Sequence, residues 1–185
     1  MDWQERWSQM RAVRGILHGS RAFGGPFQAE FGLTNLCNQT CIHCYYYSPF
    51  LEKASLRPVR KARQTGLELP SSENIGRLQT LKADTSRTNG LIDELIRMGT
   101  RRFQFSGNGE IFLHENALDF RGRVKNAGCA CWIITAGHLL NREKIDALVR
   151  MRLDEVRITV MAGTSEMYNR THPGCQDGSF EHIKD

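Results

Sequence analysis

The sequence lacks an apolar run long enough to form a membrane-spanning helix. Its first residues, Met1 to Arg6, carry mixed charge and no apolar segment, so they do not resemble a secretory signal. These two absences predict a cytoplasmic protein that makes no contact with a membrane. In a reducing cytoplasm we expect the six cysteines to bind metal or to lie buried as thiols, because disulfides rarely persist there.

The composition excludes little else. Of the 185 residues, 40% are hydrophobic and 24% are charged, which is ordinary for a globular protein. The net charge is only +5, but four basic residues cluster in one short stretch: Arg57, Arg60, Lys61 and Arg63. Such a run is typical of a solvated loop or of a surface that contacts nucleic acid, phosphate or an acidic peptide, and both interpretations stay open.

Three cysteines, Cys37, Cys41 and Cys44, lie at C-x3-C-x2-C spacing after an apolar run that ends at Leu33. The motif is one ligand short of a closed zinc site, which takes four. A zinc site would need a histidine, for which His43 is the nearest candidate. A cubane iron–sulfur cluster also takes four ligands, but three thiolates can hold it when another molecule supplies the fourth. Both hypotheses are compatible with the spacing.

The rest of the chain alternates between apolar runs and helical stripes. Strands are predicted at 27–33, 102–106, 129–135 and 154–161. Helices are predicted at 3–18, from 70, over 91–98, over 116–127, after Asn141, up to about 170 and from 179. This alternation favours a parallel sheet of β/α units, and hence an α/β fold. Ligands of parallel barrels lie at the carboxyl ends of the strands, where the cysteines, residues 107–110 and Thr159 all fall.

The cysteine loop and the strip Gly107-Asn108-Gly109-Glu110 together resemble the radical S-adenosylmethionine (SAM) superfamily. That family has C-x3-C-x2-C in its cluster loop and a "GGE" strip, here in a variant with asparagine in place of the first glycine. The proline that usually follows the strip is Ile111 in this sequence. The resemblance extends from about Phe27 to the C-terminus, and the tail from Ala162 to Pro173 looks closest to members of the SPASM or twitch type.

The resemblance implies a partial (β/α) barrel in which Cys37, Cys41 and Cys44 hold a [4Fe–4S] cluster whose free iron is chelated by SAM. It also implies that the strip residues Gly107, Asn108, Gly109 and Glu110 hold the SAM ammonium group. That group has only donors, so its site must offer carbonyls and a carboxylate. The reduced cluster would cleave SAM to methionine and a 5′-deoxyadenosyl radical, which abstracts hydrogen from a substrate.

Two further site residues follow from the resemblance. His43 would lie against the adenine, and Thr159 would hydrogen-bond the ribose or the carboxylate, although a strand threonine chosen for its β propensity explains Thr159 equally well. Flavodoxin or ferredoxin would supply the electron. The substrate stays open among a peptide, a carbohydrate or nucleoside, and an RNA.

Only four β/α units are recognisable, whereas the partial barrel of the family has six. We therefore expect residues 1–26 to form an N-terminal helix and linker. Residues 27–185 would form a radical SAM core that is truncated and lacks a C-terminal domain. Two alternatives remain: a zinc or structural metal-binding module whose basic loop contacts nucleic acid, and a fragment that binds the cluster without cleaving SAM. The other cysteines share no ligand spacing and are expected to be structural thiols: Cys129, Cys131 and Cys175.

Overall fold

The computed structural model of the chain describes residues 3–44, 48, 81–107, 109–173, 175 and 178–185. Several predictions fall outside these residues and are not tested by the structure. They concern the basic run at 57–63, the helix expected from residue 70, and Asn108 of the strip.

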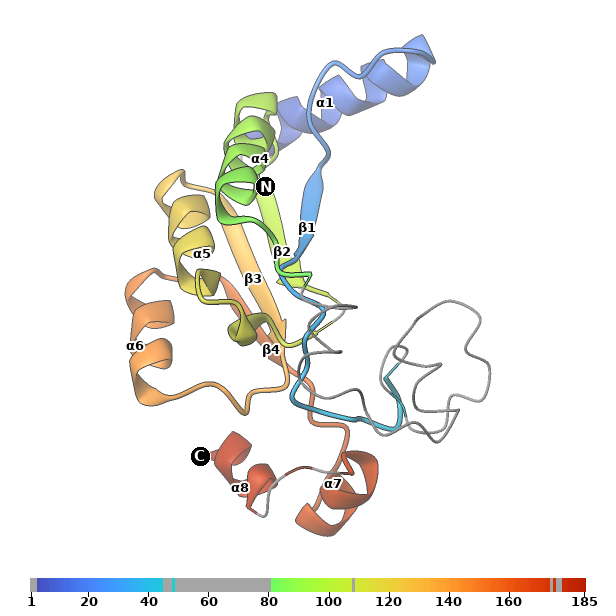
Figure 1. The fold of residues 1–185 in the computed structure, drawn as a ribbon. Helices are drawn as coiled ribbons and strands as arrows, with labels where there is room; N and C mark the ends of the chain where they lie inside the picture. Colours follow the sequence, from blue (N-terminus) through green and yellow to red (C-terminus); the bar gives the residue numbers. More distant parts are fainter. Residues whose placement is uncertain (1–2, 45–47, 49–80, 108, 174, 176–177) are drawn as a thin grey trace.

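Strands and helices alternate along the described chain (Figure 1). The elements are α1 (Trp3–His18), β1 (Gln28–Gly32), α4 (Thr85–Met98), β2 (Arg102–Ser106), the short 3₁₀ helix η1 (Ile111–Leu113), α5 (Ala117–Asn126), β3 (Ala130–Thr135), α6 (Arg142–Arg150), β4 (Glu155–Ile158), α7 (Ser165–Thr171) and α8 (Ser179–Lys184). The strands form one parallel sheet in the order β1-β2-β3-β4. This confirms the predicted α/β fold with four parallel strands.

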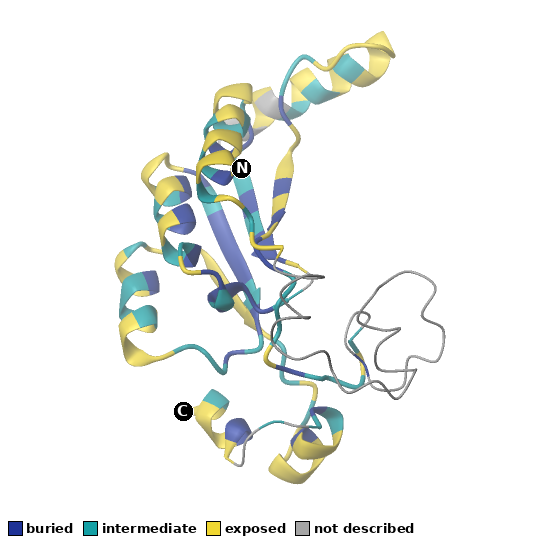
Figure 2. Ribbon diagram, in the orientation of Figure 1, coloured by how far each residue is buried: buried dark blue, intermediate teal, exposed yellow. Residues whose placement is uncertain are grey.

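The core lies between the sheet and the helices α4, α5 and α6, which are on the same side of it (Figure 1). Alternate strand residues point to this side, and Phe103, Phe105 and Ile133 are fully buried there. Figure 2 shows that burial is concentrated in β2, β3 and the helix surfaces that face them. Each buried aromatic or aliphatic side chain contributes about 1.5–3 kcal/mol, so this layer supplies most of the stability of the fold.

The opposite side of the sheet carries a connected row of polar side chains, here called the polar face: Gln28, Glu30, Arg102, Gln104, Ser106 and Trp132. The side-chain oxygen of Gln104 accepts hydrogen bonds from the Trp132 indole at 2.7 Å and from the Gln28 amide at 3.4 Å. The Arg102 guanidinium lies 5.3 Å from the centre of the Trp132 ring. Hydrogen bonds and a cation–π contact therefore order this face, which contains little apolar packing.

Two of the helix ends are set by residues that commonly begin or end helices. The φ angle of +99° at Gly99 ends α4 in the left-handed conformation that glycine adopts most easily. Asn141 begins α6, because its side-chain oxygen accepts a hydrogen bond from the Lys144 backbone N–H at 3.0 Å. The helix predicted over 91–98 begins earlier in the structure, at Thr85. There Asp84 serves as the cap and accepts from Arg87 N–H at 2.8 Å.

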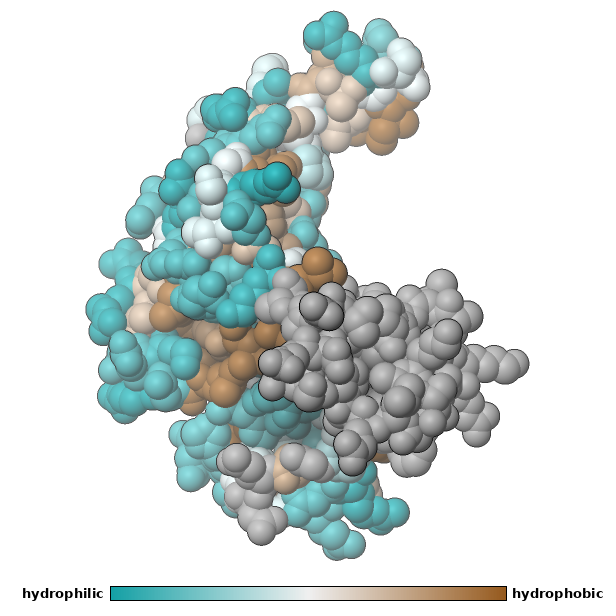
Figure 3. All heavy atoms as spheres, viewed as in Figure 1, coloured by the Kyte–Doolittle hydropathy of each residue, from teal (hydrophilic) through white to brown (hydrophobic). Residues whose placement is uncertain are grey.

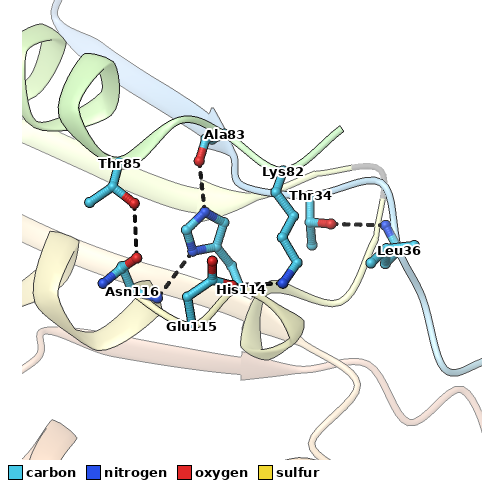
Figure 4. Close-up of polar contacts among 8 residues, drawn as sticks. All are labelled: Thr34, Leu36, Lys82, Ala83, Thr85, His114, Glu115 and Asn116. Atoms are coloured by element: carbon cyan, nitrogen blue, oxygen red, sulfur yellow. Dashed lines mark hydrogen bonds and ion pairs between the residues drawn. The ribbon is translucent and has the colours of Figure 1, made fainter. Parts of the chain in front are cut away.

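His114 ties the segment before α4 to the connection between η1 and α5 (Figure 4). Its Nδ1 accepts a hydrogen bond from the Asn116 backbone N–H at 3.1 Å, so Nε2 carries the hydrogen and donates to the Ala83 carbonyl at 2.8 Å. Beside it, Lys82 and Glu115 form an ion pair at 2.7 Å. Both ring nitrogens have partners and the ring is buried, which makes His114 a structural residue.

The last strand is shorter than predicted. A strand was expected over 154–161, but β4 ends at Ile158, and Met161 adopts a φ of +49° that no strand allows. Within the described chain, β4 pairs only with β3. Its apolar residues Val156 and Ile158 therefore stay 41% and 39% exposed at the edge of the sheet.

Helix α1 forms over the predicted range, but its apolar side chains are not buried by the described part of the chain. Trp3, Trp7, Ile16 and Leu17 are between 59% and 83% exposed, and hydrophobic surface is visible toward the end of this helix in Figure 3. The periodic pattern therefore predicts the helix correctly without identifying a packed face. None of the described helices combines the length and apolar character needed to cross a membrane.

Candidate metal and cofactor site

A cavity of about 430 Å³ lies at the carboxyl ends of the strands. It is lined by every predicted site residue that the structure describes: Cys37, Cys41, His43, Cys44, Gly107, Gly109, Glu110 and Thr159. Segments that are far apart in the sequence thus meet at the edge of the sheet where parallel folds bind their ligands. The structure brings these residues together, and the individual roles expected for them stay predictions.

The glycine strip lies directly against β1 and the cysteine loop. Gly107 has a φ of +141°, and a Cβ atom there would lie 2.7 Å from the Gly32 Cα. A Cβ atom at Gly109 would lie 2.7 Å from the Leu36 carbonyl carbon and would overlap its oxygen. The next N–H, that of Glu110, donates to this same carbonyl at 2.7 Å. Glycine is therefore required at both positions for the strip and the loop to pack.

Glu110 ties the strip to the end of β3. Its buried carboxylate accepts hydrogen bonds from the Thr135 hydroxyl at 2.7 Å, the Ala136 N–H at 2.8 Å and the Phe112 N–H at 3.2 Å. A carboxylate can accept about four hydrogen bonds, so about one position is left for a cation. The contact from the Ala136 backbone N–H is one that no side-chain motif reveals.

Burial sets the charge state of the cysteine thiols. It raises the pKa of Cys37, while the backbone N–H groups near that sulfur act in the opposite direction. Burial also raises the pKa of Cys41 to about 12, and the neighbouring thiols Cys37 and Cys44 add to the rise because thiolates repel one another. Cys37 and Cys41 are therefore protonated at neutral pH in the metal-free protein. A bound cation would lower these pKa values and stabilise the thiolates.

The cysteine loop, residues 34–44, is held in place by the segment at the end of α7. The Ile42 N–H donates to the Thr171 carbonyl at 2.9 Å, and the Thr40 hydroxyl donates to the Pro173 carbonyl. The position of the candidate metal ligands therefore depends on residues near the C-terminal end of this chain.

Two histidines meet beside Cys41. Ligand atoms of Cys41, His43 and His172 lie within 4.8 Å of one another, and the two imidazole rings are 5.3 Å apart. His43 is exposed, whereas His172 is only 1% exposed and stacks on Tyr168 at 4.0 Å. Burial lowers the pKa of His172, so its ring is neutral at neutral pH. No role was predicted for His172, because nothing near it in the sequence indicates this contact.

Strand residues complete the lining. Thr159 lies just past β4, where its N–H donates to the Thr135 carbonyl at 3.0 Å. Glu30 and Ser106 reach the cavity from the polar face, and the Ser106 hydroxyl donates to the Glu30 carboxylate. Glu30 was not among the predicted site residues, although an acidic residue inside a strand predicted to be buried is a signal that could have found it.

Comparison with known proteins identifies the fold. No family model matches the sequence, and no curated protein matches it. Among solved structures, the chain is similar to BtrN in complex with AdoMet and 2-DOIA, with a TM-score of 0.52 and 16% identity over 84% of this chain and 54% of that one. It is also similar to selenomethionine BtrN in an open conformation, with a TM-score of 0.50 and 19% identity over 77% and 53%. The chain thus has the α/β fold of these structures and spans about half of their length.

Proposed function

We propose that this chain is the cluster-bearing part of a radical SAM enzyme. The observation that carries the proposal is the shared cavity, in which Cys37, Cys41 and Cys44 face the strip that ends in Glu110. Cysteine spacing alone describes a metal ligand set. The same cavity is also lined by the Glu110 carboxylate and by the backbone of Gly107 and Gly109, which could bind the ammonium group of an amino acid cofactor. In addition, the chain has the fold of BtrN, which has been crystallised with AdoMet.

The donor set fits a [4Fe–4S] cluster. Three neighbouring thiols supply three thiolates, and an external ligand must complete the fourth iron. Cys37, Cys41 and Cys44 would hold the cluster. When bound, the cluster supplies an electron for the cleavage of SAM to methionine and a 5′-deoxyadenosyl radical, which takes hydrogen from the substrate.

In this proposal the chain itself would bind and orient SAM. Glu110 would accept a hydrogen bond from the SAM ammonium with its remaining acceptor position, beside the backbone of Gly107 and Gly109 that lines the cavity. Thr159 would hydrogen-bond the ribose or the carboxylate, and His43 would lie against the adenine.

The polar face supports a polar substrate. Glu30 and Ser106 line the cavity, and Gln104 and Gln28 extend the row of polar side chains along the sheet. A molecule that extends from the cavity along the sheet would therefore meet hydrogen-bonding groups. Of the substrates considered, a carbohydrate or nucleoside fits such a surface best. The enzyme would receive its electron from flavodoxin or ferredoxin. A C-terminal domain of the SPASM or twitch type would complete it.

Anaerobic reconstitution with iron and sulfide tests the proposal. The protein should become brown, with broad absorbance near about 400 nm, and should release 5′-deoxyadenosine from SAM after reduction by dithionite. Cys41→Ser should abolish both results, whereas Cys129→Ala, which changes a buried thiol outside the cavity, should preserve them. A colourless protein with stoichiometric zinc would contradict the proposal. A cluster that gives no 5′-deoxyadenosine would indicate a cluster-binding fragment without the proposed activity.

Glu110→Gln tests the cofactor contact separately from the cluster. The amide keeps the size of the side chain and removes its charge, so iron and sulfide content should not change. Loss of a hydrogen bond to a charged group costs about 1.5–3 kcal/mol, which weakens SAM binding about 10- to 100-fold. Equilibrium dialysis with radiolabelled SAM measures the effect. Unchanged SAM affinity would show that Glu110 serves only to cap η1 and to tie the strip to the end of β3.

A further inference from the structure

A second set of metal ligands overlaps the cysteine motif. The ligand atoms of Cys41, His43 and His172 lie within 4.8 Å of one another, although they come from segments at opposite ends of the chain. Ligands around one tetrahedral zinc ion are about 3.3–3.8 Å apart, given metal–ligand distances of about 2.0–2.3 Å. Side-chain shifts of about 1 Å would therefore bring all three atoms onto a common ion.

The protonation of His172 is already the one that a metal ligand needs. Its Nδ1 lies 3.2 Å from the Tyr168 carbonyl and 2.9 Å from the Thr171 hydroxyl, which itself donates to the Met167 carbonyl at 2.9 Å. Both neighbours of Nδ1 act as acceptors, so Nδ1 carries the hydrogen and the lone pair is on Nε2. Histidines that bind metals commonly donate their other N–H to a backbone carbonyl in this way.

The lone pair of His172 has no partner among the described residues. Its Nε2 makes no hydrogen bond to any residue that the structure describes, although the ring is only 1% exposed. The stacking on Tyr168 at 4.0 Å and 12° fixes the plane of the ring, and a hydrogen bond of 2.5 Å between His138 Nε2 and the Tyr168 hydroxyl fixes the tyrosine. A buried acceptor without a partner is costly, and a rigid ring beside Cys41 presents that acceptor to an ion.

We propose that Cys41, His43 and His172 bind a single divalent cation of the zinc or ferrous type when the cluster is absent. One thiolate and two imidazoles suit such ions, and three protein ligands leave one position for water. The Cys41 thiol releases its proton to solvent as the metal binds. Because Cys41 also belongs to the set with Cys37 and Cys44, the single ion and the cluster exclude each other. Exposed His43 gives the ion a path from solvent.

Titration of the reduced, cluster-free protein with Co²⁺ tests the site, because this ion reports its ligands by absorbance. We expect one ion per chain, with thiolate-to-cobalt absorbance and the intense visible bands of a tetrahedral ion, and displacement by Zn²⁺. Cys41→Ser and His43→Ala should each weaken binding by at least about 100-fold, the upper end of what loss of a supporting partner costs. Cys37→Ser keeps all three proposed ligands and should bind Co²⁺ with unchanged affinity.

His172 requires a more careful substitution because it is buried. His172→Phe keeps the stacking on Tyr168 and removes the ligand atom, and it should lose Co²⁺ binding while its circular dichroism stays unchanged. His43→Ala supplies the same test at an exposed position, where folding is not at risk. His18→Ala, at an exposed histidine on α1, is the matched control and should bind Co²⁺ like the original protein.

Two results would overturn this proposal. One is the absence of stoichiometric Co²⁺ binding. The other is that Cys37→Ser and Cys44→Ser lose Co²⁺ while His43→Ala and His172→Phe retain it, which would place the ion on the three cysteines. Reconstitution with iron and sulfide tests the proposed function independently of this metal site. Cys37→Ser should lose the cluster and keep Co²⁺, whereas His43→Ala should lose Co²⁺ and keep the cluster.

Discussion

On one side of the sheet, Phe103 and Phe105 are fully buried beneath the helices, whereas on the other side Gln104 connects the side chains of Trp132 and Gln28 through hydrogen bonds. These residues alternate along the same strands, so one stretch of sequence builds both faces. The helix-covered face derives its stability from apolar burial. The polar face contributes less stability and leads to the cavity that holds the candidate ligands. Four substitutions or conditions test this contrast.

The largest effect is expected at the centre of the helix-covered face. Phe103→Ala should lower the free energy of unfolding by about 3–5 kcal/mol, because it removes a fully buried ring and leaves a cavity that the sheet cannot close. Urea unfolding followed by circular dichroism measures the change. A loss smaller than about 1 kcal/mol, the range of an ordinary surface or polar substitution, would mean that this face does not dominate stability.

A pH effect comes next, from Cys131 on the same face. Burial raises the pKa of this thiol from 9.0 to about 12, with Arg121 acting in the opposite direction. A raised pKa in the folded state means that stability is complete below about pH 9 and is lost as the pH rises toward 12, by about 1.4 kcal/mol per pH unit.

Urea unfolding at about pH 8 and about pH 10, on either side of the thiol pKa in the unfolded chain, measures this loss. Cys131→Ala is the control, because it removes the titrating group. The variant should lose less stability between the two pH values than the original protein. Equal losses would show that Cys131 ionises as freely in the folded chain as in the unfolded one.

A smaller loss is expected from the polar face at the residue next to Phe103. Gln104→Ala should cost about 1 kcal/mol, the net contribution of a typical hydrogen bond, because water can replace part of what the side chain provides. The same unfolding experiment measures it, and tryptophan fluorescence reports the change around Trp132. A cost equal to that of Phe103→Ala would remove the distinction between the two faces.

The smallest effect is expected at the edge of the sheet. Val156→Thr keeps the shape and strand propensity of a side chain that is 41% exposed, so the free energy of unfolding should change by no more than about 0.5 kcal/mol. A loss of several times that size would indicate that another part of the protein covers this edge in solution.

The helix-covered face could largely be predicted from the sequence, because apolar periodicity and end signals are local. Gly99 and Asn141 mark helix ends in the sequence and do so in the structure. The polar face could not be predicted in the same way. Its strands were treated as buried apolar runs, so Glu30 and Gln104 received no role. The length of β4 was also overestimated, because the sequence does not show where its pairing with β3 stops.

The candidate site likewise contains residues that could be predicted from the sequence and residues that could not. The cysteines and the strip could be found from spacing and family resemblance, and the structure places the three cysteines and the described strip residues around one cavity. His172 could not be found, because its contact with Cys41 depends on how α7 packs at the far end of the chain. The hydrogen bond from the Ala136 N–H to Glu110 could not be predicted either. Nearly every residue has a backbone N–H donor, so a sequence motif does not indicate which of them makes such a contact.

The backbone of Gly109 lies against the Leu36 carbonyl with no room for a Cβ atom between them. Because of this contact, the cysteine loop and the strip could be transferred to another protein only as one unit. A chimera that receives only the loop would place Leu36 against a foreign side chain, and a chimera that receives only the strip would lose the surface on which it rests. Protein engineers who wish to move this candidate site would have to transfer the β1–β2 pair with both of its following segments.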